Sequence, residues 1–135
     1  MPKIAITGSR KWENRLKLKD TLFKLKNKYK SDLTVISGGT GEGVDSLVKK
    51  YSLEFDLDYA EARPNHFDWS PYCIEPAYMY NRDFKANNYY IRNTKLIKEA
   101  DAVLLFITKD EVSPVMKNIV QQCDKKCKKL IIITE

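Results

Sequence analysis

Two stretches of the sequence each run from an apolar segment into glycine: IAITGSR at residues 4–10 and LTVISGGTGEGVD at residues 33–45. A short apolar run is typical of a buried strand, and glycine permits the sharp turn that follows it. In an open α/β sheet, ligands bind at the carboxyl ends of strands, where loops lead into helix N-termini with free N–H groups. Two such loops therefore predict a site for a nucleotide-like anion.

Apolar runs alternate with helical periods along the rest of the chain, which is typical of a parallel α/β sheet. We expect strands at 3–7, 33–37, 57–62, 102–107 and 129–134, and helices at 14–30, 43–55, 89–100 and from 114 onward. The last helix should carry Val115, Ile119, Cys123 and Cys127 on its inner stripe. Right-handed crossovers then favour a doubly wound sheet of about five strands in the order 3-2-1-4-5. This order predicts a crevice between residues 8–10 and the loop 108–113.

The composition indicates a globular protein, with 43% hydrophobic and 31% charged residues. We expect one domain, 1–135, without a signal peptide or membrane span, in the cytoplasm. Three cysteines and one histidine without metal-ligand spacing argue against a disulfide framework and a metal site, and we expect no cofactor.

The stretch from 65 to 90 interrupts the alternation, because it is irregular and rich in aromatic residues. Long irregular connections in compact domains are usually functional or pack against a partner. We therefore expect this insert to form either a lid or the interface of a homodimer or higher homo-oligomer.

Basic residues are concentrated in the first 36 residues, with ten Lys and Arg against three acids. Such a segment can attract nucleic acid. Its lysines, however, alternate with the leucines of the predicted helix 14–30, which favours an ordinary solvated helix face.

The candidate ligand-binding residues lie in the predicted loops and at the start of the third helix. They are Gly8, Ser9, Arg10, Trp12, Ser37, Gly38, Gly39, Thr40, Gly41, Gly43, Asp45, Trp69, Arg92, Asn93 and Lys109. Glycine N–H groups and arginines suit phosphate, Asp45 suits loop N–H groups or a ribose hydroxyl, and the tryptophans suit stacking on a base.

Several of these motifs together resemble the SLOG superfamily (SMF/DprA–LOG), specifically its YspA-like branch. The residues concerned are TGSR at 7–10 with Trp12, the loop 37–45, Trp69, Arg92-Asn93 and ADAVL at 100–104. The resemblance implies a Rossmann-like domain that binds nucleotides or nucleotide-derived ligands, often as a sensor in bacterial or phage conflict systems. Members commonly have a glycine-rich turn after the fourth strand, whereas loop 108–113 has no glycine and offers Lys109 instead.

Binding of a nucleotide-derived small molecule, by sensing or sequestering it, is the leading hypothesis, and two alternatives stay open. The LOG branch implies an N-glycoside hydrolase or phosphoribohydrolase, a reaction that needs a carboxylate near the anomeric carbon. Glu42 and Asp45 are weak catalytic candidates, because the catalytic motif of that branch is absent. The DprA branch, which residues 37–45 also resemble, implies binding of single-stranded DNA.

Overall fold

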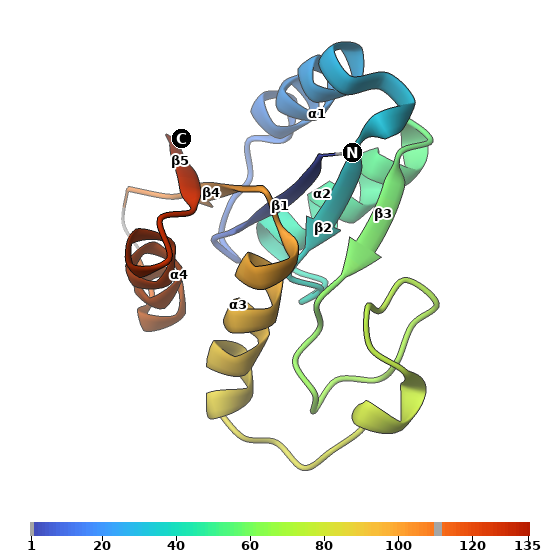
Figure 1. Cartoon of the computed structure of the whole chain (residues 1–135). Coiled ribbons are helices and arrows are strands. Elements are labelled where there is room, and N and C mark those ends of the chain that lie inside the picture. Colours follow the sequence, from blue (N-terminus) through green and yellow to red (C-terminus); the bar gives the residue numbers. More distant parts are fainter. Residues whose placement is uncertain (1, 110–111) are drawn as a thin grey trace.

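A computed structural model describes residues 2–109 and 112–135, over which strands and helices alternate (Figure 1). The strands are β1 (Lys3–Gly8), β2 (Thr34–Ser37), β3 (Asp58–Glu61), β4 (Ala102–Ile107) and β5 (Lys129–Thr134). The α-helices are α1 (Arg15–Tyr29), α2 (Gly43–Glu54), α3 (Asn87–Glu99) and α4 (Pro114–Lys125), and the short 3-10 helices are η1 (Lys30–Asp32) and η2 (Ala77–Met79).

The strands form one parallel sheet in the order β3-β2-β1-β4-β5. β1 lies in the middle, where Ala5 is opposite Ile36 of β2 and Val103 of β4. The strand order reverses between β1 and β4, which makes this the switch point at which doubly wound sheets bind ligands. The predicted fold and strand order are confirmed.

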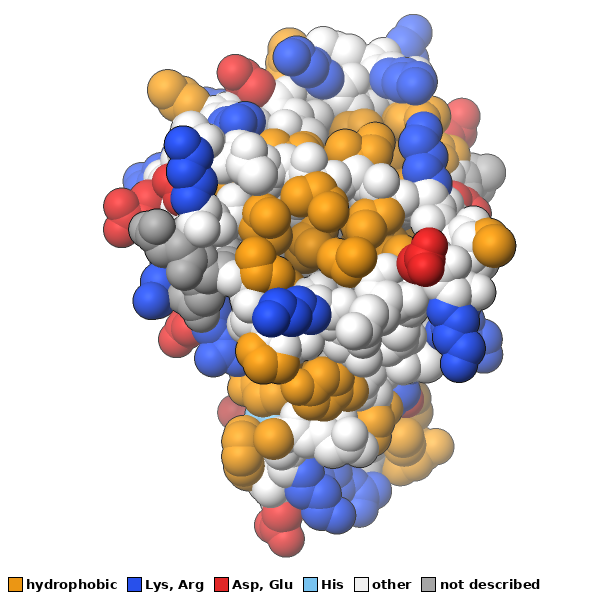
Figure 2. All heavy atoms as spheres, turned by 90° about the vertical axis from the view of Figure 1, so that its left-hand side faces the viewer, with side chains coloured by type: hydrophobic (Ala, Val, Ile, Leu, Met, Phe, Trp, Pro, Cys, Tyr) orange, Lys and Arg blue, Asp and Glu red, His pale blue; other side chains and the backbone are white. Residues whose placement is uncertain are grey.

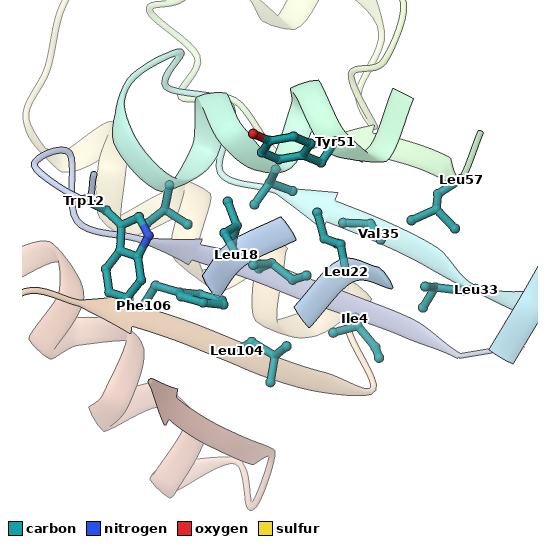
Figure 3. Packing of buried hydrophobic residues seen from close by; sticks show 13 residues of the cluster. Ile4, Trp12, Leu18, Leu22, Leu33, Val35, Tyr51, Leu57, Leu104 and Phe106 are labelled. Atoms are coloured by element: carbon teal, nitrogen blue, oxygen red, sulfur yellow. The ribbon is translucent and has the colours of Figure 1, made fainter. Parts of the chain in front are cut away.

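Helices cover both faces of the sheet, so the hydrophobic core has two halves. On one face α1 and α2 pack over Ile4 and Ile6 (Figure 3), and on the other α3 and α4 pack over Ala5. Successive side chains of a strand point to opposite faces. A strand buried on both faces therefore needs the unbroken apolar run that β1 has.

Polar side chains cap the N-termini of α1 and α4. Asn14 Oδ1 accepts a hydrogen bond from the Lys17 N–H at 3.1 Å, and Ser113 Oγ accepts one from the Met116 N–H at 3.2 Å. Such caps satisfy amides that have no partner within the helix. At the other end of α4, the predicted inner stripe is one residue too long: Cys127 is exposed and lies beyond the helix with a φ of 53°.

Residues 62–86 form an irregular segment that extends beyond the carboxyl ends of β2 and β3 (Figure 1). The buried carboxylate of Glu61 holds its beginning, because Ser70 Oγ donates to Glu61 Oε2 at 3.0 Å. Two further contacts join it to α3: the His66 ring centroid lies 5.2 Å from that of Tyr89, and Glu75 Oε1 lies 2.6 Å from Lys95 Nζ. The segment is therefore folded onto the domain.

Trp12, a candidate for stacking on a base, lies in the hydrophobic core of this structure. Its exposed fraction is 3%, and its ring meets that of Phe106 edge-on at a centroid distance of 5.1 Å (Figure 3). Trp12 Nε1 donates to the backbone oxygen of Asn14 at 2.9 Å, so its polar group also has an internal partner.

Replacing each of the two tryptophans in turn should show which one contributes to the stability of the core. We expect Trp12→Ala to lower the free energy of unfolding by about 3–5 kcal/mol, because it leaves a cavity in the core. Trp69, whose exposed fraction is 47%, is the matched control, and Trp69→Ala should change stability by less than about 1 kcal/mol. Urea denaturation followed by circular dichroism measures both, and equal losses would contradict this assignment.

Candidate functional site

A cavity of about 200 Å³ lies at the switch point, at the carboxyl ends of β1 and β4. Its lining comes from the end of β1 and the turn after it, the glycine loop 37–43, and the helices α2, α3 and α4. The lining residues are Thr7, Gly8, Arg10, Thr40, Asp45, Tyr89, Arg92, Ser113, Val115, Met116 and Ile119. This is the position that the strand order predicts for a crevice. Asp110 and Glu111 of the neighbouring loop lie outside the described residues.

The turn after β1 places Arg10 at the cavity. Ser9 in the same turn forms hydrogen bonds that connect it to β4 and α2. A Cβ at Gly8 would lie 2.8 Å from the carbonyl carbon of Phe106, so glycine lets β1 and β4 stay paired here. The Ser9 N–H donates to the Phe106 oxygen at 2.9 Å, and the Ser9 oxygen accepts from the Val44 N–H at 3.1 Å. The Ser9 hydroxyl accepts a hydrogen bond from the Lys11 N–H at 3.1 Å. The polar groups of Ser9 are therefore used within the fold.

Asp45, in the first turn of α2, holds the glycine loop in place. It is buried, and Oδ1 accepts hydrogen bonds from Thr7 Oγ1 at 2.8 Å and the Gly38 N–H at 3.2 Å. Oδ2 accepts from Thr40 Oγ1 at 2.8 Å and the Thr40 N–H at 3.3 Å. One carboxylate thus connects β1, the glycine loop and α2.

Three amides of the glycine loop therefore point inward. The Gly39 N–H donates to Ser37 Oγ at 2.9 Å, while those of Gly38 and Thr40 donate to Asp45. A Cβ at Gly38 would lie 2.6 Å from Asp45 Oδ2, so a larger residue would push the carboxylate away. Three of the loop amides are therefore bonded within the protein, two to Asp45 and one to Ser37, and the expectation that the loop cradles a phosphate stays a prediction.

Arg92 supplies a buried cation to the cavity. Its exposed fraction is 4%; Nη1 donates to the Gly38 oxygen at 2.7 Å and Nε to Asn93 Oδ1 at 3.0 Å. These bonds use two of the five N–H donors of a guanidinium. Burial lowers the pKa of Arg92, while the negative charge of Asp45 acts in the opposite direction. An arginine this basic stays protonated, so the cavity contains a desolvated positive charge.

Asn93 positions α4 rather than lining the cavity. It is fully buried, and its Nδ2 donates to the Val115 oxygen at 3.0 Å and to Asn118 Oδ1 at 3.2 Å. Because its Oδ1 also accepts from Arg92, Asn93 fixes both the guanidinium and the start of α4.

Tyr89, which the sequence analysis missed as a site residue, joins the two arginines. The guanidinium carbons of Arg10 and Arg92 lie 5.2 and 5.8 Å from its ring centroid, within cation–π range. Thr7 was missed as well. A tyrosine at a helix start and a threonine at a strand end have no local signal for such roles. The α4 wall could be foreseen only in part, through the predicted inner stripe with Val115 and Ile119.

Five of the predicted ligand-binding residues line the cavity: Gly8, Arg10, Thr40, Asp45 and Arg92. The structure does not bring the others to its wall: Ser9, Trp12, Ser37, Gly38, Gly39, Gly41, Gly43, Trp69, Asn93 and Lys109. Lys109, Trp69 and Gly41 are exposed elsewhere. Gly43, with a φ of 53°, leaves room for the turn after β1, since its Cβ would lie 2.6 Å from the Arg10 Cα. Glu42 is exposed and lies outside the cavity wall.

The parallel sheet in 3-2-1-4-5 order and the polar cavity at its switch point define a Rossmann-like α/β protein. The model of the YspA, cpYpsA-related SLOG family matches residues 2–69, and the chain belongs to this family. A comparison with curated proteins found no match. Family membership associates the chain with nucleotide-related binding or glycosidase activity. In the part of the chain that the structure describes, no helix has the length and apolarity to cross a membrane.

Asp45→Asn tests whether this carboxylate holds the site together. The amide keeps the size but presents an NH₂ group where donors already converge, so we expect a loss of about 2–4 kcal/mol in unfolding free energy. Glu42→Gln, a few residues away and exposed, is the matched control and should change it by less than about 0.5 kcal/mol. Chemical denaturation measures both; a stable Asp45→Asn protein would show that the hydrogen bonds contribute little.

Proposed function

We propose that this protein binds a nucleotide-derived small molecule in the cavity at the switch point and acts as a sensor or sequestering protein. The observation that carries the proposal is the convergence of Arg10 and Arg92, from separate elements, on one cavity around Tyr89. Among the described residues, Asp45 is the sole acid that lines it, and this carboxylate is already hydrogen-bonded. The lining is therefore positive toward a ligand.

A phosphate group suits this arrangement for energetic reasons. A buried guanidinium has lost its water, and an anion restores the lost interaction energy through charge-assisted hydrogen bonds. Arg92 has three further N–H donors beyond its two internal bonds. Arg10 is exposed, so it can close on a ligand after entry. Together they support the negative end of the ligand being held beside Tyr89.

The remaining wall supports a sugar or base as the rest of the ligand. Val115, Met116 and Ile119 present apolar side chains from α4, and the hydroxyls of Thr40 and Ser113 lie among the other lining groups. The cavity volume of about 200 Å³ is below the range of about 300–1,000 Å³ of drug-sized sites. This favours a compact ligand, such as a mononucleotide or a sugar phosphate derived from one, over an extended dinucleotide.

The hydrolase alternative needs a carboxylate that can approach an anomeric carbon. Both oxygens of Asp45 are occupied by donors of the loop, and Glu42 lies outside the cavity wall. We therefore expect no release of base when the protein is incubated with nucleoside monophosphates. Base release by the wild-type protein would establish the hydrolase instead, and its loss in an Asp45→Asn protein that circular dichroism shows to be folded would assign the carboxylate.

The ligand itself can be sought by denaturing the purified protein and analysing the released small molecules by mass spectrometry. An intact nucleotide derivative supports binding, and its identity would show whether a conflict-system signal is involved. Free base together with ribose phosphate would favour hydrolysis. If no compound is released and no mononucleotide, dinucleotide or cyclic ADP-ribose raises the melting temperature, the proposal is wrong.

Arg10→Ala tests the site without disturbing the core. For the nucleotide that gives the largest thermal shift, we expect about a 10- to 100-fold weaker Kd by calorimetry, because a hydrogen bond to a charged group contributes about 1.5–3 kcal/mol. Arg15→Ala removes an equal, exposed charge outside the cavity and is the matched control. Equal effects of the two substitutions would mean that Arg10 acts only through general charge.

A further inference from the structure

The outer strand β5 presents an unusual edge. Among the described residues, β5 pairs only with β4, so the backbone groups on its other side face outward. Its sequence, KLIIIT, contains four consecutive aliphatic residues, and the exposed fractions of Ile131 and Ile132 are 43% and 47%. Edge strands are normally kept short, charged or covered, since a bare apolar edge pairs with other strands. This edge lacks that protection along its middle.

The exposed edge is part of a larger apolar area. Figure 2 views the molecule from the side on which β5 and α4 lie and shows hydrophobic side chains gathered at the centre of this face. A groove of about 440 Å³ adjoins the strand, with Val120, Cys123 and Leu130 in its wall. Contiguous apolar surface of this kind marks an interaction site.

We propose that β5 pairs in an antiparallel manner with β5 of a second copy of this chain, so that the two sheets form one continuous sheet across a twofold axis. Such an interface is self-complementary, because the same strand contributes the same backbone donors and acceptors on both sides. The proposal does not depend on the ligand, because no residue of β5 lines the cavity.

The charges at the two ends of the strand select the register. A twofold antiparallel pairing places one residue opposite its own copy. With Ile132 at the axis, Ile131 faces Ile133 and Lys129 faces Glu135 of the second copy. Moving the axis by one residue places Lys129 opposite Ile133, or Glu135 opposite Ile131. Opposite charges stabilise a cross-strand pair, so the pattern of this strand matches its own reverse in this register alone.

The two faces of the strand fit the same arrangement. Leu130 packs toward the core half under α3 and α4, whereas Ile133 packs toward the half under α1 and α2. Pairing of the edges would therefore extend both halves of the core across the axis. At the end of the strand, Lys17 Nζ donates to the Thr134 oxygen; this long, exposed side chain can move aside without loss of core packing.

Light scattering after size exclusion tests the association. We expect the wild-type chain, whose mass is 15.7 kDa, to elute with twice that mass at micromolar concentrations. Ile132→Lys should yield a monomer that keeps its folded circular dichroism spectrum, because it places two ammonium groups opposite each other at an exposed position. Phe84→Lys, on the exposed part of the aromatic insert, is the matched control and should leave the dimer intact.

Each other outcome overturns the proposal. A monomeric wild-type protein would leave the edge to a different partner, and a dimer broken by Phe84→Lys but not by Ile132→Lys would place the interface on the insert. A dimer that survives both substitutions uses neither surface.

A charge exchange tests the register separately. Lys129→Glu and Glu135→Lys should each weaken the dimer by about tenfold in Kd, since two like-charged pairs replace two opposite ones, and the double variant should restore the affinity. Absence of this rescue would show that the strands do not pair with Ile132 at the axis. Analytical ultracentrifugation gives the three dissociation constants, and circular dichroism confirms that each variant is folded.

Discussion

The carboxylate of Asp45 connects the end of β1, distant in the sequence and reached through Thr7, with the loop after β2, reached through Gly38 and Thr40, and with α2 itself. A carboxylate this deeply buried costs several kcal/mol of hydration unless hydrogen bonds replace the lost water. Four donors do so here, and each of them has to lie at one position. The shape of the loop, and the glycine at 38 beside Asp45 Oδ2, follow from that single charge.

Because three of the loop amides are bonded within the protein, side chains rather than backbone groups face a ligand in this cavity. A glycine loop with open amides binds anions through its backbone, but here those amides are bonded to Asp45 and Ser37. Positive charge at the cavity comes instead from Arg10 and Arg92, the second of which is fixed by Gly38 and Asn93. The family match at residues 2–69 covers the cavity wall up to Asp45, whereas Tyr89, Arg92 and the α4 wall lie beyond it. The matched residues thus supply Arg10 and the loop around Asp45, while the later part of the chain supplies Arg92, Tyr89 and the α4 wall.

The two edge strands of the sheet, β3 and β5, differ in what contacts them. At the β3 edge, Glu61 forms a bridge with Cys73 of the segment that follows, and the buried Glu61 side chain binds Ser70. At the other edge, β5 is apolar and exposed along its middle. The segment after β3 thus contacts the β3 edge at Glu61, whereas the middle of β5 stays exposed.

Much of the fold could be predicted because its signals are local. Apolar runs indicated the strands, helical spacing of leucines indicated α1, and the handedness of crossovers predicted the order 3-2-1-4-5 together with the position of the cavity. The glycine motifs likewise indicated the family. What the sequence could not indicate depends on contacts between distant residues. Trp12 is buried because it packs against Phe106 of β4, and Arg92 is held at the site because its guanidinium reaches the Gly38 oxygen. Tyr89 reaches the site only because α3 packs beside the turn after β1. The sequence by itself therefore determined the elements and their order, while the tertiary structure decided which polar groups remain available to a ligand, since the buried Arg92 uses two of its donors within the fold and keeps the others for the cavity.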